Sequence, residues 1–324
     1  MKEAFNLPLS SALLTEYGGT EGLRQELSEL GCQGIEGIWS LEPVPAGFSP
    51  ELITGYHLTF YSDWLDFYRE DKQALTEKFG SLDAARSFYG GWGAEYILAI
   101  YREDLARAKA LGAEYLVFHV SDASAEENFT YCWRHSHQEV IDASAEILRT
   151  LLAEEAGDFL FLLENQWWPG FTLTKPALTE RLLEGVSYPR TGILLDTGHL
   201  LNTNPALRTE AEGAAYIQSL LDAHGSLCQY IRGVHFHQSL SGAYVQAHWG
   251  RLPEDLPEDP GERFAAVYRH ILQIDRHQPW TVPEAAAIVE RLEPAYLTHE
   301  LAAGSRAARR QAVLRQRAVL ENRI

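Results

Sequence analysis

The sequence predicts an α/β protein in which eight parallel strands close into a single-domain (β/α)8 TIM barrel. Short β-rich apolar runs recur along the chain, and a longer stretch with helical spacing follows each run. No Pro/Ser/Gly-rich linker divides the 324 residues, so residues 1–324 are expected to form one domain. A doubly wound open sheet is the alternative, but the first strand is not followed by the G-x-G-x-x-G turn that would support it.

The eight strands are expected at residues 5–9, 34–39, 53–60, 115–120, 159–164, 191–196, 231–237 and 296–301. Helical patterns between them include residues 21–30, 97–111, 139–155 and 284–292. The first three patterns run up to Gly31, Gly112 and Gly157, and Pro294 stops the fourth. Two long connections, near residues 61–93 and 239–279, are expected to be loop insertions, and residues 303–324 a C-terminal helix.

The composition indicates a soluble protein with a large core. Hydrophobic residues make up 46% of the chain, which excludes a disordered polypeptide. The three cysteines, Cys32, Cys132 and Cys228, are widely spaced and form no C-x-x-C pair, so a reducing cytoplasm is expected rather than a disulfide framework. The N-terminus has no pattern of a secretion signal, and no apolar run is long enough to span a membrane.

Carboxylates and imidazoles recur at the carboxyl ends of the expected strands, where barrels of this kind place their active sites. In chain order they are His57, His119, Glu164, Asp196 with His199, His235 with His237, and Glu300. A single histidine in an apolar strand is usually a hydrogen-bonded core residue. Buried carboxylates, however, need a cation, hydrogen-bond donors or a shifted pKa. The set therefore predicts a divalent-metal site with nitrogen and oxygen ligands, suited to Mn, Co, Mg, Fe or Zn.

This ordered set resembles the xylose isomerase-like TIM barrels, a family that includes sugar isomerases and epimerases, inosose dehydratases and endonuclease IV. The shared motifs are Glu-Asn after strand five, Asp-x-x-His after strand six, His-x-His in strand seven and the Glu of strand eight. The resemblance implies a metal bound by Glu164, Asp196, a strand-seven histidine and Glu300. We favour His235 over His237 because its surroundings match the endonuclease-type strand. Neither histidine is followed three residues later by the acid that many members carry.

The first functional hypothesis is a divalent-metal-dependent isomerase or epimerase of a small sugar or polyol. By resemblance to the epimerases, Glu164 and Glu300 would be the acid/base pair that moves a proton next to a carbonyl. Trp167 and Trp168 could form an apolar platform for a sugar ring, with ordinary packing as the alternative. No Gly-rich phosphate loop is evident near strands seven and eight, which favours an unphosphorylated ligand.

The alternative hypothesis is a multinuclear-zinc hydrolase or phosphodiesterase. His57, His119, His199 and an Asp-x-His motif at Asp275 and His277 resemble the extra ligands with which endonuclease IV holds three zinc ions. The motif falls about 40 residues after His235, behind an acidic insertion, so a helix end is the simpler interpretation of it. His57, His119, His199, His237 and His277 are thus candidates for a second metal or for substrate hydroxyls. A non-catalytic binding barrel is the third alternative, although the complete residue set argues against it.

Charge separates these hypotheses from nucleic-acid binding. The formal net charge is −18, and the insertions contain the acidic stretches SDWLDFYREDK and LPEDLPEDPGE. Such a field repels a phosphate backbone unless one patch inverts it. The arginine-rich segment after Ser305 has helical periodicity typical of the last helix of a barrel. We expect a small-molecule substrate and no nucleic-acid partner, and leave a homo-oligomer open.

Overall fold

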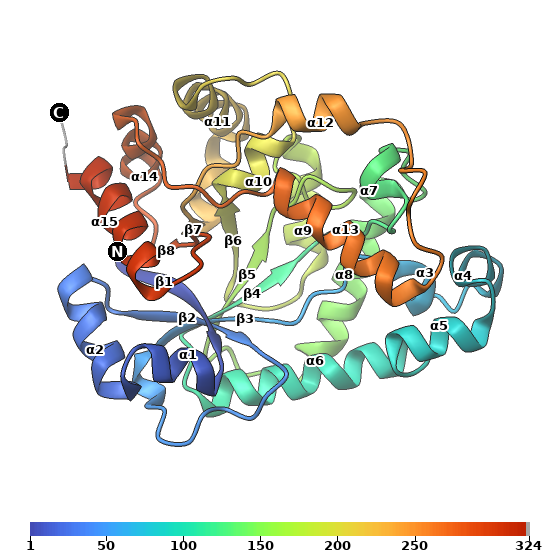
Figure 1. Ribbon diagram of the computed structural model, residues 1–324, viewed down its shortest axis with the longest axis horizontal. Helices are drawn as coiled ribbons and strands as arrows, with labels where there is room; N and C mark the ends of the chain where they lie inside the picture. The colour runs from blue at the N-terminus through green and yellow to red at the C-terminus, as the bar shows by residue number, and fades with distance from the viewer. Residues whose placement is uncertain (322–324) are drawn as a thin grey trace.

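The computed structural model describes residues 1–321, and these form a closed barrel with the strand order β1 to β8 (Figure 1). The strands are β1 Lys2–Leu9, β2 Gly34–Trp39, β3 Ile53–His57, β4 Tyr115–His119, β5 Leu160–Glu164, β6 Thr191–Asp196, β7 Ile231–His235 and β8 Tyr296–His299. Neighbouring strands pair in parallel, and β1 closes the barrel on β8. The predicted (β/α)8 barrel is therefore confirmed.

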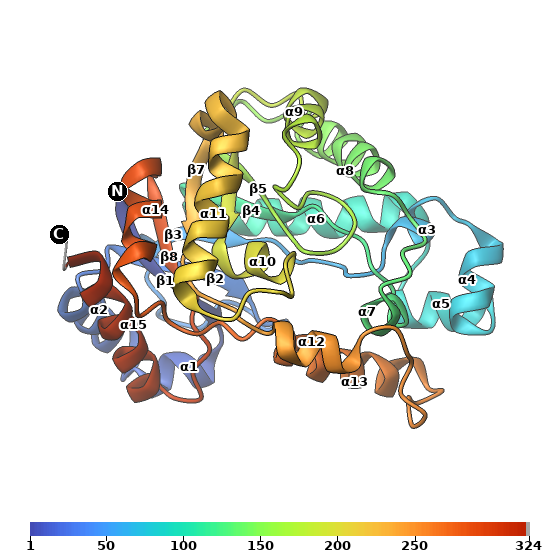
Figure 2. The same cartoon turned by 90° about the horizontal axis from the view of Figure 1, so that it is seen from above.

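Helices surround the barrel, as both ribbon views show (Figures 1 and 2). The longer ones are α2 Gly19–Leu30, α6 Gly93–Ala110, α8 His137–Leu151, α9 Pro176–Gly185, α11 Glu210–His224, α13 Pro260–Ile274 and α15 Arg306–Glu321. The shorter ones are α1 Ser11–Glu16, α3 Leu65–Tyr68, α4 Lys72–Phe79, α5 Leu82–Tyr89, α7 Glu127–Thr130, α10 Thr197–Asn202, α12 Gly242–His248 and α14 Ala286–Leu292. Three 3-10 turns lie at Pro50–Leu52, Gly225–Tyr230 and Pro283–Ala285. Within residues 1–321, no helix is both long and apolar enough to cross a membrane.

Three of the four predicted helix ends agree with the structure within one residue, and the end of α8 differs. α2 ends at Gly31, whose φ of 69° is the left-handed conformation that glycine adopts readily. α8 begins at a capping box formed by Ser136 and Glu139 but ends at Leu151, well before Gly157. The predicted extension was wrong because it carries acidic residues, which are unfavourable at the negative end of a helix. For the predicted helix 303–324, residues 322–324 lie outside the described part of the chain.

Four of the eight strands end earlier than the apolar pattern suggests. β7 ends at His235, whereas the pattern predicts a strand up to residue 237, and β3, β4 and β8 likewise end one to three residues early. Beyond β7, Gln238 pairs with Gln278 in an isolated antiparallel bridge. Because β7 ends at His235, His237 lies in the loop that follows this strand. The same bridge joins the end of the second insertion to the rim of the barrel.

Alternation along the strands decides which side chains enter the barrel. In β4, Tyr115 and Val117 pack with Leu162 and Leu194 in a small cluster of their own, while Leu116 and Phe118 belong to the large core shared with the helices. Successive side chains of a strand point to opposite faces. His119, Glu164 and Asp196 continue the inward-facing series of β4, β5 and β6, so their positions at the rim follow from the strand period alone.

The two insertions are structured and contact each other. Residues 61–93 contain α3, α4 and α5, and residues 239–279 contain α12 and α13. Both ribbon views show α13 extending toward α5, and the rings of Phe88 and Phe264 are 6.2 Å apart (Figures 1 and 2). The loop insertions expected from the sequence are thus mostly helical.

A buried ion cluster fixes the first insertion to the barrel. The Lys78 ammonium contacts Asp63 and lies 2.8 Å from Asp66 Oδ2, and only 9% of the lysine side chain is exposed. The carboxylate of Asp122, just beyond β4, accepts hydrogen bonds from the backbone N–H groups of Trp64 and Leu65. The buried ammonium of Lys78, together with the imidazole of His135 that lies 3.0 Å from Asp66 Oδ1, therefore compensates carboxylates that would otherwise face a low-dielectric interior.

The substitution Lys78→Met is expected to lower the free energy of unfolding by about 3–5 kcal/mol, because it leaves buried carboxylates without their cation. Urea denaturation followed by circular dichroism measures this change. Lys72→Met, at an exposed position of the same helix, is the control and is expected to change stability by less than about 0.5 kcal/mol. Equal stability of the two variants would show that the ion cluster does not hold the insertion.

Candidate metal centre

Residues 1–321 contain three groups of potential metal ligands at the carboxyl-terminal rim of the barrel, and within each group one ligand atom per residue lies within 4.8 Å of the others. The central group is Glu164, Asp196, His235 and Glu300. The β3–β4 group is His57, His119 and Glu164. The outer group is His199, His237, Asp275 and His277. Glu164 belongs to both the central group and the β3–β4 group. A contact between Asp196 and His237 connects the outer group to the central group, so the three groups form one centre.

The central group has the mixed carboxylate and imidazole composition that the sequence predicts. His235 Nδ1 lies 2.8 Å from Glu300 Oε2, 3.5 Å from Glu164 Oε1 and 3.6 Å from Asp196 Oδ2. All four side chains are buried. The structure thus places His235, rather than His237, among the three carboxylates.

In the β3–β4 group, two imidazole nitrogens meet the second oxygen of Glu164. His57 Nε2 and His119 Nε2 lie 3.3 and 3.0 Å from Glu164 Oε2, and 2.9 Å from each other. His57 Nδ1 lies 2.8 Å from the carbonyl oxygen of Leu58, which can only accept a hydrogen bond. Nδ1 therefore carries the proton when the ring is neutral, and Nε2 keeps its lone pair free for a metal.

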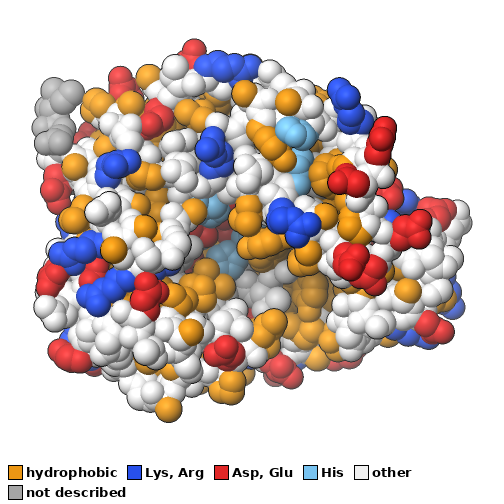
Figure 3. Space-filling view, in the orientation of Figure 1, with side chains coloured by type: hydrophobic (Ala, Val, Ile, Leu, Met, Phe, Trp, Pro, Cys, Tyr) orange, Lys and Arg blue, Asp and Glu red, His pale blue; other side chains and the backbone are white. Residues whose placement is uncertain are grey.

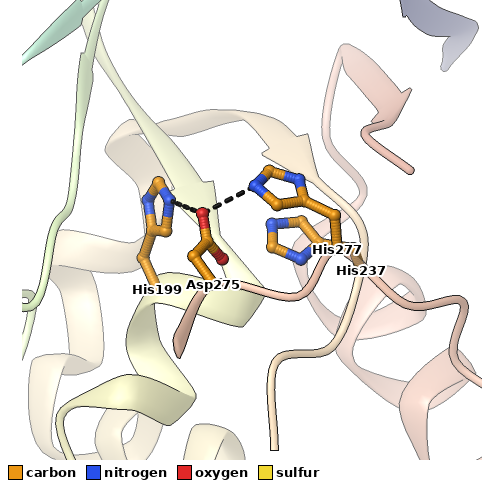
Figure 4. Close-up of side chains that lie close together, drawn as sticks. All are labelled: His199, His237, Asp275 and His277. Carbon is orange, nitrogen blue, oxygen red and sulfur yellow. Dashed lines mark hydrogen bonds and ion pairs between the residues drawn. The ribbon is translucent and has the colours of Figure 1, made fainter. Parts of the chain in front are cut away.

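The outer group joins α10 and the loop after β7 to the second insertion (Figure 4). Asp275 Oδ2 lies 3.1 Å from His199 Nε2 and 2.6 Å from His277 Nε2. The ring of His237 stacks on that of His277 with 4.2 Å between centroids. The Nε2 atom of His237 lies 2.9 Å from Asp196 Oδ2, and this contact links the outer group to the central group.

Local backbone contacts position the Asp-x-His motif. The hydroxyl of Ser239 donates to Asp275 Oδ1 at 2.8 Å and accepts the backbone N–H groups of Arg276 and His277. His277 Nδ1 lies 3.0 Å from the carbonyl oxygen of Glu300. The sequence spacing made a helix end the simpler interpretation, and α13 does end at Ile274. The bridge between Gln238 and Gln278, which the sequence pattern could not reveal, then brings the motif to the rim.

The donor atoms fit divalent metal ions. Both carboxylate oxygens of Glu164, His235 Nδ1 and Glu300 Oε2 are buried, and none has a hydrogen-bond partner among the described residues. A buried polar group without such a partner costs about 1–3 kcal/mol, and more when charged. Cations placed between these atoms would remove that cost. Glu164 presents Oε1 to the central group and Oε2 to the β3–β4 group, so its carboxylate is suited to bridge two ions.

The electrostatics of the centre favour bound cations. Burial disfavours the carboxylate of Glu300, yet His235 and His277 hold its pKa at about 2. Burial also disfavours a charged His277, yet Asp275 and Glu300 raise its pKa to about 10. Asp275 likewise has a pKa well below its usual value despite burial, because His277 and His199 lie beside it. The positive charge that these carboxylates attract from imidazolium groups could equally come from metal ions.

Aromatic side chains lie close to the centre. The ring of Trp167 is 5.2 Å from that of His199, and Trp168 packs against Trp167. Both indoles are buried in a cluster with Val245 and Ile274, so packing accounts for much of their surface. Phe60, by contrast, is 45% exposed and its ring lies 4.6 Å from that of His119.

Phe60 was not singled out in the sequence because its exposure depends on β3 ending three residues earlier than predicted. The space-filling view shows a hollow near the middle of this face, with histidine and acidic surface visible inside it and hydrophobic surface around it (Figure 3). A small ligand could therefore reach the centre from this side.

The chain belongs to the xylose isomerase-like TIM barrel family, whose sequence profile matches residues 25–293. The fold resembles that of endonuclease IV from Thermus thermophilus, with a TM-score of 0.57 and 16% identity over 100% of both chains. It also resembles L-ribulose 3-epimerase, with a TM-score of 0.50 and 13% identity over 99% of this chain and 95% of that chain. The IOLI protein, solved with a zinc atom, has a TM-score of 0.50 and 14% identity over 98% and 96% of the two chains. No curated protein sequence shows significant similarity to this chain.

The profile match establishes the family, and the likeness to endonuclease IV and L-ribulose 3-epimerase establishes the fold. At 13–16% identity these comparisons leave the substrate class undetermined. The chemistry must therefore be inferred from the ligand groups themselves.

The substitution Glu164→Gln is expected to reduce metal binding in two groups at once, because each oxygen of Glu164 serves a different group. Elemental mass spectrometry after dialysis of metal-loaded protein measures the loss. The control is Glu26→Gln, a buried carboxylate of α2 that pairs with Arg306 and Arg310 outside the three groups. Full metal content in the Glu164 variant would contradict the bridging role.

Proposed function

We propose that this protein is a multinuclear metal-dependent hydrolase that cleaves phosphoester bonds in a small substrate. The observation that carries the proposal is the sharing of Glu164 between two ligand groups, with a third group connected to them through Asp196 and His237. A mononuclear epimerase would need only the central group for its metal. The histidines of the other two groups would then have to contact substrate hydroxyls instead of metal ions.

Charge balance also supports more than one metal ion. The three groups contain four buried carboxylates, those of Glu164, Asp196, Asp275 and Glu300. One divalent ion would neutralise only two of these negative charges, whereas three ions would leave the centre positive. A net positive centre suits an anionic substrate such as a phosphoester. The metals could thus recognise phosphate without the Gly-rich loop that the sequence lacks.

The residues of the chain have distinct tasks in this proposal. Bound divalent ions would polarise a phosphoryl oxygen and lower the pKa of a water molecule. Glu164 holds the central and β3–β4 positions together, while Ser239 orients Asp275 of the outer group. The exposed ring of Phe60 provides apolar contact for the leaving group of the substrate. Zinc is the favoured metal because six imidazoles contribute to the three groups.

The net charge of −18 disfavours a nucleic-acid substrate and makes a small phosphoester the better candidate. The three cysteines are free, in keeping with a cytoplasmic location. The second candidate is a sugar or polyol epimerase. It is favoured by one observation, which is that two buried carboxylates able to exchange protons, Glu164 and Glu300, meet in the central group around His235.

Two assays on zinc- or manganese-loaded protein distinguish the candidates. The first follows hydrolysis of bis(p-nitrophenyl) phosphate and p-nitrophenyl phosphate, and the second follows interconversion of ketohexoses by chromatography. We expect hydrolysis and no epimerisation. His277→Gln should reduce hydrolysis by about 100-fold or more, because one metal position loses a ligand. His248→Gln is the matched control, since His248 is an exposed histidine of α12 outside all three groups.

The opposite pattern would favour the epimerase. Ketohexose epimerisation that persists in His277→Gln, together with no phosphoester hydrolysis by the wild type, would contradict the proposal. Loss of both activities in Glu300→Gln would not separate the candidates, because Glu300 serves the central group in either case.

A further inference from the structure

Glu36 of β2 lies fully buried inside the barrel, beneath the central group, and the three ligand groups do not include it. Its Oε2 lies 3.0 Å from His235 Nε2. The hydroxyl of Tyr115 donates to the same oxygen at 2.8 Å. Thr298 Oγ1 lies 2.9 Å from the Tyr115 hydroxyl and 3.3 Å from Glu36 Oε2. These groups come from four different strands and meet on one carboxylate oxygen.

The hydrogens in this cluster determine the tautomer of His235. An ionised carboxylate can only accept hydrogen bonds, so the Nε2 atom facing Glu36 must carry a proton. The opposite tautomer would place a nitrogen lone pair against a carboxylate oxygen at 3.0 Å. With the proton on Nε2, the neutral ring has its free lone pair on Nδ1. That nitrogen lies 2.8 Å from Glu300 Oε2, within the central group.

We propose that Glu36 is a positioning residue that makes His235 an Nδ1 metal ligand and raises the affinity of the central group for its metal ion. Tyr115 supports this role by fixing the carboxylate, and Thr298 supports Tyr115. A carboxylate hydrogen-bonded to a ligand histidine fixes the orientation of the ring and makes the nitrogen a stronger donor. The other oxygen of Glu36 has no hydrogen-bond partner in residues 1–321, so the carboxylate interacts mainly through Oε2.

The burial of Glu36 is consistent with this role rather than with stabilisation of the barrel. The interior of a TIM barrel is normally filled by branched apolar side chains. A buried carboxylate at such a position is costly unless its charge is compensated. Through His235, the charge of Glu36 is coupled to that of a metal ion in the central group. The inference rests on the proposed function only in requiring a metal at this group, which the epimerase alternative also requires.

The test compares zinc affinity in Glu36→Gln, Tyr115→Phe and the wild type by competition with a chromophoric chelator. Glu36→Gln keeps the shape of the side chain but removes its charge. It should lower the affinity for one zinc ion per chain by about 10–100-fold. Tyr115→Phe keeps the carboxylate and removes one donor, so a smaller loss is expected. Glu26→Gln is the matched control for loss of a buried carboxylate and should leave zinc affinity unchanged.

Imidazole nitrogen NMR of the zinc-loaded wild type gives an independent readout, with His235→Gln used to assign the signal. We expect a proton on Nε2 of His235 and zinc on Nδ1. Unchanged zinc affinity in Glu36→Gln, or a proton on Nδ1 with zinc on Nε2, would overturn the inference. If Glu36→Gln does not fold, two other results test the inference. Either a proton on Nδ1 of His235 with zinc on Nε2, or zinc affinity in Tyr115→Phe equal to that of the wild type, would overturn it.

The two proposals fail in different ways. A wild-type protein that binds a single zinc ion, weakened by Glu36→Gln, would contradict the multinuclear hydrolase and support the role of Glu36. A wild-type protein that binds three zinc ions, with affinities that Glu36→Gln leaves unchanged, would support the multinuclear hydrolase and contradict the role of Glu36. Absence of zinc from the central group would contradict both.

Discussion

The buried carboxylate of Glu164 is the constraint on which the rest of the centre depends. It is fully buried at the carboxyl end of β5, and the imidazoles of four histidines lie within 3.5 Å of its two oxygens. Imidazoles come close to both oxygens, yet neither has a hydrogen bond within the described residues. Such a group is stable only when positive charge is supplied to both sides. The need for cations therefore follows from the placement of one side chain.

The barrel satisfies this need by delivering ligands from many strands. The strand period turns His119, Glu164, Asp196 and His235 to the same inner rim, and the pairing of β7 with β8 brings Glu300 beside them. The outer group is different because it depends on an insertion. A bridge between two glutamines and the hydroxyl of Ser239 holds Asp275 and His277 in place. The regular geometry of a barrel thus builds the central group, while local loop contacts build the outer one.

Strand period and strand order predicted the fold and the rim position of the side chains that include the central group, and the family resemblance singled those four out as a set. The sequence offered Asp275 and His277 only in the alternative hypothesis, since the path of a 41-residue connection, residues 239–279, depends on tertiary contacts. It also missed Glu36, which is only one polar residue in an apolar strand until Tyr115 and His235 are brought against it. The ambiguity between His235 and His237 arose because β7 ends between them, and a residue pattern does not locate that end.

The number and location of bound metal ions is the property that most directly defines this centre. Anomalous diffraction at the zinc edge, from crystals of protein purified without chelator and loaded with zinc, locates each ion relative to its ligands. Three peaks are expected, one in each group, with Glu164 between two of them. A single peak in the central group, with the β3–β4 and outer groups empty at full zinc loading, would contradict a multinuclear hydrolase and leave a mononuclear centre of the epimerase type.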